Sequence, residues 1–156
     1  MTLDEEQLLA RRQDGLEIFY KELMPVLVDF VDRLGIRPPH EVLNHAEQFA
    51  PYLETALADL EPADEDDRVW LTARVAYFVG EYFVQKYKGC WLVNDVKGSK
   101  SFARYVVGRF SKFPNGELMI DPFEVSFAFV GSARPRKLGD FLNEVDDSVV
   151  KAATLH

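Results

Sequence analysis

The segment from Val75 to Val84 constrains the fold more than any other part of this 156-residue chain. Every residue in it is apolar or aromatic except Gly80 and Glu81. In a helix its apolar side chains would lie on all sides, and a helix that is apolar all round is a buried one. We therefore predict a central helix over about residues 66–88, enclosed by other parts of the chain.

Two helical regions precede this segment. Apolar residues recur every three or four positions over residues 3–34, which indicates a long helix with a kink or break near Gly15 or Pro25. The second region covers about residues 39–60. Pro51 is expected to split it in two, because proline cannot donate the backbone hydrogen bond that a helix interior needs.

Short strand-like segments follow the central helix, which Gly89 is expected to end. Residues 91–94 and 102–110 have strand composition, and Asn115-Gly116 is a hairpin signal before a third strand at residues 117–120. These segments predict a small antiparallel sheet laid against the central helix.

Asp121-Pro122 then has the order of a helix start, with a capping acid followed by proline at the first helical position. Phe123, Phe127 and Val130 are expected to form the buried stripe of this helix. A last amphipathic helical segment follows, and the chain after Val149 is expected to be loosely held.

The patterns together predict an α+β fold, with N-terminal helices and a buried central helix packed on a small antiparallel sheet, followed by C-terminal helices. A chain of this length with 47% hydrophobic residues can bury one sizeable core. We interpret residues 1–156 as a single domain, with a helical half at residues 1–88 and the sheet plus C-terminal helices at residues 89–150.

Three short motifs resemble a known kind of domain. They are GEYF at Gly80–Phe83, GCW at Gly89–Trp91 and IDPF at Ile120–Phe123. Their combination is similar to small, uncharacterised bacterial α+β domains, and the resemblance covers the C-terminal half of the chain. It implies a bacterial α+β domain and carries no activity, cofactor or site residue.

The formal net charge of −8 is concentrated in the helical half. Residues 1–88 carry 9 Lys/Arg against 18 Asp/Glu, whereas residues 89–156 carry 9 against 8. An acidic surface repels nucleic acid and favours basic partners, and it also keeps a protein in solution. The basic segment, residues 97–112, is a local exception with the five cations Lys97, Lys100, Arg104, Arg109 and Lys112. A sequence pI of 4.9 argues against nucleic-acid binding there.

The sequence also bears on the compartment. The uninterrupted apolar stretches are far shorter than the roughly 20 residues that cross a bilayer, so no membrane association is expected. The acidic N-terminal residues do not suit a secretory signal. Cys90 is the single cysteine, which rules out a disulfide within the chain, and we interpret it as a packing residue. These features favour the cytoplasm.

Glu81 is the first residue to consider for function. An ionised carboxylate in apolar surroundings needs a cation or hydrogen-bond donors, or else it stays protonated. Arg104 interrupts an apolar strand and is the expected partner, because a guanidinium binds a carboxylate in a bidentate manner. This pair would form the polar floor of an aromatic ligand pocket. The competing interpretations are a purely structural ion pair, or Glu81 on an exposed edge of the helix. The candidate ligand-binding residues are Tyr77, Glu81, Tyr82, Trp91, Arg104 and Tyr105.

No catalytic residues, metal or cofactor are predicted. His40 and His45 flank Glu41, but five residues apart on a helix they would point to different sides, whereas a shared metal needs a spacing of four. The sequence therefore favours a protein that is not an enzyme.

Two functional hypotheses remain. The favoured one is a non-catalytic protein-interaction domain, which binds a partner protein or a second copy of itself through its acidic helical surface or the edge of its sheet. An inhibitor or immunity protein against a basic toxin is one version. The alternative is a small-molecule-binding domain or enzyme with an aromatic pocket around Glu81 and Arg104.

Overall fold

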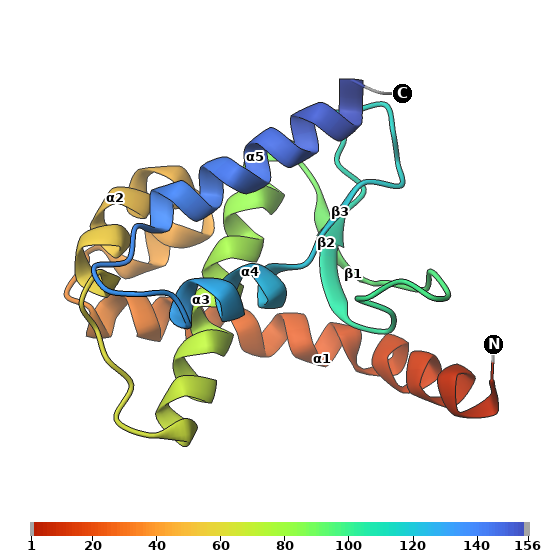
Figure 1. Cartoon of the computed structure of the whole chain (residues 1–156), viewed down its shortest axis with the longest axis horizontal. Coiled ribbons are helices and arrows are strands. Elements are labelled where there is room, and N and C mark those ends of the chain that lie inside the picture. Colours follow the sequence, from red (N-terminus) through yellow and green to blue (C-terminus); the bar gives the residue numbers. More distant parts are fainter. Residues whose placement is uncertain (1, 155–156) are drawn as a thin grey trace.

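The computed structural model describes residues 2–154 and has the α+β fold that the sequence predicts. Helix α1 crosses the lower half of the molecule, α3 rises from below it through the middle and α5 lies along the top, while the sheet stands at one end between α1 and α5 (Figure 1). The elements are α1 (Leu3–Arg33), the 3₁₀ helix η1 (Pro39–Leu43), α2 (Ala46–Leu57), α3 (Glu65–Tyr87), β1 (Cys90–Val93), β2 (Tyr105–Gly108), β3 (Met119–Ile120), α4 (Pro122–Val130) and α5 (Leu138–Thr154).

Helix α3 is the buried central helix. The Asp64 side chain caps its start by accepting a hydrogen bond from the backbone N–H of Asp67. From Val75 to Phe83 every residue except Tyr77 is buried. The prediction that this segment lies in the interior is therefore confirmed.

The end of α3 differs in detail from the prediction. Lys88, with φ of 58°, adopts the left-handed conformation that ends the helix, rather than Gly89. Gly89 is needed for a different reason, since a Cβ there would collide with the carbonyl oxygen of Gly108 and the ring of Phe110. A glycine at this position thus lets β1 leave α3 directly beside β2.

The three strands form an antiparallel sheet in the order β1-β2-β3. Trp91 pairs with Val107, which also pairs with Ile120, so these three side chains share the sheet face that joins the core. Strand β2 begins at Tyr105 rather than at the predicted residue 102. Ala103, with φ of 63°, departs from the extended conformation that a strand requires.

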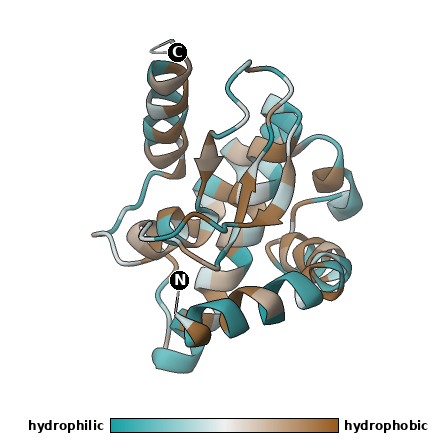
Figure 2. Cartoon of the chain, turned by 90° about the vertical axis from the view of Figure 1, so that its right-hand side faces the viewer, coloured by the Kyte–Doolittle hydropathy of each residue, from teal (hydrophilic) through white to brown (hydrophobic). Residues whose placement is uncertain are grey.

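The opposite face of the sheet points away from the helical core. Figure 2 looks onto the sheet from this side and shows that the residues of its strands are mainly hydrophobic. Val106 is buried there, whereas Leu92 and Met119 are half-buried. Strand β1 is adjacent to β2 on one side and to α1 on the other, while β3 has a strand neighbour only in β2.

The N-terminal helices correct two predictions. Helix α1 is continuous through Gly15 and Pro25, so it is not broken at either position, and the kink that was the other form of the prediction stays a prediction. Pro51 lies inside α2, and the second helical region is instead divided at Asn44–His45, between η1 and α2.

A side chain of α3 accounts for that division. The Gln85 side-chain oxygen accepts a hydrogen bond from the backbone N–H of Ala46 at 2.8 Å, and its amide group donates to the carbonyl of Val42 at 3.0 Å. One glutamine therefore satisfies the end of η1 and the start of α2, where a continuous helix would have used its own backbone.

Helix α4 begins as predicted, because the Asp121 side chain accepts hydrogen bonds from the backbone N–H groups of Phe123 and Glu124. Its buried stripe is shifted from the predicted one. The Ser126 hydroxyl donates to the carbonyl of Thr72 at 2.6 Å and turns that face toward α3. Phe127 is consequently 70% exposed, and its predicted burial is wrong.

Helix α5 continues to Thr154, beyond the point where the chain was expected to loosen. The Glu54 side chain in α2 caps its start by accepting a hydrogen bond from the backbone N–H of Gly139 at 2.8 Å. Near its middle, Asp146 forms a salt bridge of 2.8 Å with Lys86 and accepts a hydrogen bond from the Tyr87 hydroxyl.

Candidate functional site

Glu81 lies in the interior, between α3, α1 and β1, with only 3% of its surface exposed. The indole N–H of Trp91 donates a hydrogen bond to Glu81 Oε2 at 3.3 Å, and the hydroxyl of Tyr20 is near enough to influence the same carboxyl group. No salt bridge to Glu81 is found within residues 2–154. The interpretation of Glu81 as a residue on an exposed helix edge is therefore wrong.

The surroundings of Glu81 disfavour its ionised form. Burial raises the pKa of Glu81 above its ordinary value, and the hydrogen bond from Trp91 and the nearby Tyr20 hydroxyl oppose only part of that rise. Burial, followed by the proximity of Glu81, also raises the pKa of Tyr20. The result is a buried group that can hold a proton where α1, α3 and β1 meet.

Arg104 does not pair with Glu81, so that predicted ion pair is wrong. Its Nη1 lies 3.0 Å from Asp121 Oδ2, and the Arg104 side chain is 50% exposed. Asp121 also accepts a hydrogen bond from the Ser101 hydroxyl at 2.7 Å, in addition to capping α4. Arg104 therefore helps to hold the segment before β2 against the start of α4.

The predicted aromatic residues divide into two groups. Tyr77, Trp91 and Tyr105 each contact the ring of Phe19 in α1, with centroid distances of 5.9, 5.3 and 4.2 Å. Tyr82 contacts other rings of α3 instead. The structure thus gathers three of the four predicted aromatic residues around Phe19 and places Tyr82 in a different cluster.

A cavity of about 400 Å³ lies beside this cluster. Trp91, the hydrogen-bond donor to Glu81, and Tyr20 contribute to its lining together with Leu16 of α1. Cys90 also lines it and is exposed, which corrects its interpretation as a packing residue. The volume is within the range of small-molecule sites.

Sequence reasoning missed Phe19 and Tyr20. Phe19 falls within the apolar pattern of residues 3–34, and no sequence motif marks Tyr20. The one available signal is that two aromatic residues are adjacent in the sequence. Neighbouring side chains of a helix point about 100° apart, so such a pair can contact two neighbouring elements at once.

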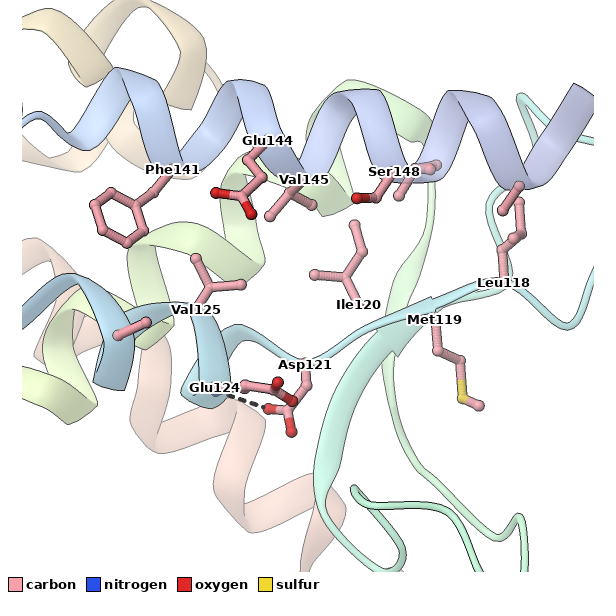
Figure 3. A pocket seen from close by; sticks show the side chains of 13 residues that line it. Leu118, Met119, Ile120, Asp121, Glu124, Val125, Phe141, Glu144, Val145 and Ser148 are labelled. Atoms are coloured by element: carbon pink, nitrogen blue, oxygen red, sulfur yellow. Dashed lines mark hydrogen bonds between the residues drawn. The ribbon is translucent and has the colours of Figure 1, made fainter.

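A second hollow, the β3–α5 groove, was not predicted from the sequence. It has a volume of about 360 Å³ and lies between the edge of the sheet, α4 and α5 (Figure 3). Figure 3 shows Ile120, Val125 and Val145 directed into this space from the three elements. The apolar residues that line the groove include Ile120, Val125, Ala128, Phe141, Val145 and Val149.

The rim of the groove is acidic. Asp121 and Glu124 stand on one side, where Arg104 and Lys100 respectively pair with them. Glu144 stands on the other side, on α5, and no salt bridge to Glu144 is found in residues 2–154. The groove therefore combines an apolar floor with a negative charge that the described chain does not neutralise.

Both histidines lie close to the carboxylate of Glu41. His40 Nε2 lies 3.6 Å from one oxygen of Glu41, and His45 Nε2 lies 3.3 Å from the other. His40 lies in η1 and His45 follows the end of η1, so the two do not share one continuous helix as the prediction assumed. No cluster of metal-binding side chains is found in the described range, residues 2–154.

The basic segment is partly neutralised by the rest of the chain. Lys100 pairs with Glu124 and Arg104 pairs with Asp121. Two of its five cations therefore already bind carboxylates at the start of α4.

Comparison of the chain with protein-family models, curated proteins and solved structures finds no match. Among residues 2–154, no helix has both the length and the apolar character needed to span a bilayer.

Proposed function

We propose that this chain is a non-catalytic protein-interaction domain, and that a partner protein with a basic surface docks at the β3–α5 groove. The observation that carries the proposal is the combination of an apolar groove floor with Glu144, an exposed acid that no cation in residues 2–154 pairs with. Apolar contact supplies binding energy, and complementary charge speeds and orients the encounter.

The overall charge supports a basic partner. The excess of acids over bases in residues 1–88 gives the helical half a negative field, which attracts cationic surfaces over longer distances than any single contact. The resemblance of Gly80–Phe83 and Ile120–Phe123 to bacterial domains leads us to propose a bacterial cytoplasmic protein. An inhibitor or immunity protein that neutralises a basic toxin is one form of this function, and a second copy of the chain is the competing partner.

Site-specific photo-cross-linking in cells tests the proposal. A photo-reactive phenylalanine derivative is placed at Ser148, which lines the groove and is exposed, and in a matched protein at Asp14, which is exposed on α1. We expect one protein to be cross-linked from Ser148 and not from Asp14, and purified complexes to dissociate as salt increases. Equal cross-linking from both positions, or none from Ser148, would refute docking at the groove.

The small-molecule alternative keeps one specific observation in its favour. The buried Glu81 carboxyl accepts a hydrogen bond from Trp91, which lines the cavity of about 400 Å³ together with Tyr20. Arg104 no longer contributes to this alternative, because it pairs with Asp121. The site would be a mainly apolar pocket backed by a carboxyl group that can donate a hydrogen bond when protonated.

A thermal-shift screen with a panel of metabolites tests the alternative. Gln13→Trp fills the cavity from α1, and Gln7→Trp places the same side chain at another exposed position of α1 outside the cavity residues. A genuine ligand should stabilise the wild type and Gln7→Trp but not Gln13→Trp. If no metabolite class shifts the melting temperature, the alternative loses its support.

A further inference from the structure

We infer that the β3–α5 groove takes an extended peptide segment of its partner, with alternating apolar residues and at least one Lys or Arg, which adds to β3 as a further strand. This inference rests on the proposed function and specifies what the partner presents.

The lining of the groove shows that it runs along the edge of the sheet. Four consecutive residues, Leu118 to Asp121, contribute to it. Side chains of a strand alternate between the two faces of a sheet, so a cavity on one face would contact only every second residue. Met119 and Ile120, the two residues of β3, both line the groove, so it borders the edge of this strand, where main-chain groups point outward.

That edge has no strand partner. Strand β3 pairs with β2 through Val107–Ile120 and Gly108–Met119, and the sheet of the described chain ends there. An extended segment can hydrogen-bond to such an edge, whereas a helix cannot, because its own backbone groups are already paired.

Helix α5 supplies the opposite wall and sets the length of the occupant. Its groove-lining residues recur at helical spacing from Phe141 to Ala152, the remaining members being Glu144, Val145, Ser148 and Val149. Eleven helical steps span roughly 16 Å, which equals roughly five residues of extended chain. The occupant is therefore a short segment.

Charge specifies its composition. Glu144 projects from the α5 wall with no salt bridge in residues 2–154, and Asp140 and Asp147 are exposed on the same helix. The floor is apolar, because Ile120 and Val145 point into the groove (Figure 3). Alternate side chains of an extended segment would thus meet the apolar floor, while a cationic side chain between them reaches Glu144.

The test selects linear peptides from a random phage-displayed library on the full chain. We expect enriched peptides to alternate apolar residues with others and to contain Lys or Arg. For the best synthetic peptide, Glu144→Lys should raise the Kd roughly five- to tenfold at low salt and less at high salt. Ser148→Trp, which fills the groove, should abolish binding. Asp14→Lys makes the same charge change on α1 and should leave the Kd unchanged.

Backbone methylation of the peptide tests the strand itself. An added strand uses every second peptide N–H to pair with an edge, so methylation at alternate positions should abolish binding while the intervening positions tolerate it. Uniform tolerance, enrichment of peptides without Lys or Arg, or no enrichment would overturn the inference. If photo-cross-linking from Ser148 still captures a partner in those cases, docking at the groove survives and its occupant is a folded surface. If peptides bind equally well to Ser148→Trp, both proposals fail.

Discussion

Trp91 of β1 lies directly against Gly80 of α3, so closely that a methyl group on Gly80 would overlap atoms Cζ2 and Cη2 of the indole ring. The next residue of α3, Glu81, accepts the hydrogen bond of the same indole. Two neighbouring residues of α3 therefore accommodate Trp91. Gly80 leaves space for the indole ring, and Glu81 accepts the hydrogen bond of its N–H.

Gly80→Ala should therefore destabilise the protein, although alanine is the better helix former. The overlap with Trp91 requires a shift of packed groups, and such overpacking costs about 3 kcal/mol at a site that cannot relax. The higher helix propensity of alanine offsets roughly 1 kcal/mol of this loss of stability. Urea unfolding measures the difference. Gly116→Ala is the matched control, since a Cβ there has no neighbour within 4 Å, and an equal effect of both changes would contradict the explanation.

Glu81→Gln should make stability less dependent on pH. Burial raises the pKa of Glu81 in the folded state above the ordinary value of 4.5, so the folded chain holds this proton to higher pH than the unfolded chain. The stabilisation is full below the ordinary value and is lost as pH rises through the folded-state pKa. Each unit of difference between the two pKa values corresponds to about 1.4 kcal/mol.

Free energies of unfolding at pH 5 and pH 8 measure this effect. Gln keeps an acceptor for Trp91 without a charge, so the variant should gain on the wild type as pH increases. Glu22→Gln removes a charge from an exposed position of α1 and serves as the control. A gain of the same size in both variants would show that burial of Glu81 is not its origin.

Arg136→Met should cost about 3 kcal/mol. The Arg136 side chain is 4% exposed and donates to the carbonyl groups of Leu60 and Val130 at 2.6 and 3.2 Å, so its loss leaves two acceptors unpaired. Arg134→Met is the control. Arg134 forms a salt bridge of 2.9 Å with Glu61, with both side chains about half exposed, and such surface pairs contribute at most about 1 kcal/mol. Thermal and urea unfolding measure both losses of stability. A larger loss for Arg134→Met than for Arg136→Met would contradict the explanation.

Asp146→Asn should loosen the attachment of α5 to α3. The change weakens the bonds to Lys86 and Tyr87, and bonds of this charged kind contribute about 2 kcal/mol. Hydrogen exchange of the backbone amides of α5 should accelerate more than that of α3. Asp147→Asn, a neighbouring exposed position, should leave the exchange rates unchanged. Uniform acceleration throughout the chain would instead indicate global destabilisation.

Features encoded by a few adjacent residues could be predicted from the sequence. Asp121-Pro122 specifies the start of α4 because the capping acceptor, the fixed proline backbone and the unpaired N–H groups lie within four residues. The interior position of α3 was equally predictable, since apolar residues around a whole helix leave no face for water.

Features that depend on distant partners could not be predicted. The sequence offers both Glu81 and Asp121 as partners for Arg104. Only the folded chain shows that Asp121, the cap of α4, lies beside it. The division of η1 from α2 depends on Gln85, about forty residues away along the chain, rather than on Pro51. The β3–α5 groove joins residues from three elements, and no single segment carries a signal of it.

Asp121 has a consequence for how the groove can change shape. The Asp121 carboxylate caps α4 and binds Ser101 and Arg104. A movement of the sheet-side wall would therefore break the cap of α4 and release the segment before β2 at the same time. Helix α5 is held at its start and middle by the bonds to Glu54 and Asp146, and it also buries Leu138, Leu142 and Val149. If the groove widens to admit a bulkier peptide, α5 is therefore the wall that pivots outward, while the wall formed by β3 and the start of α4 stays in place.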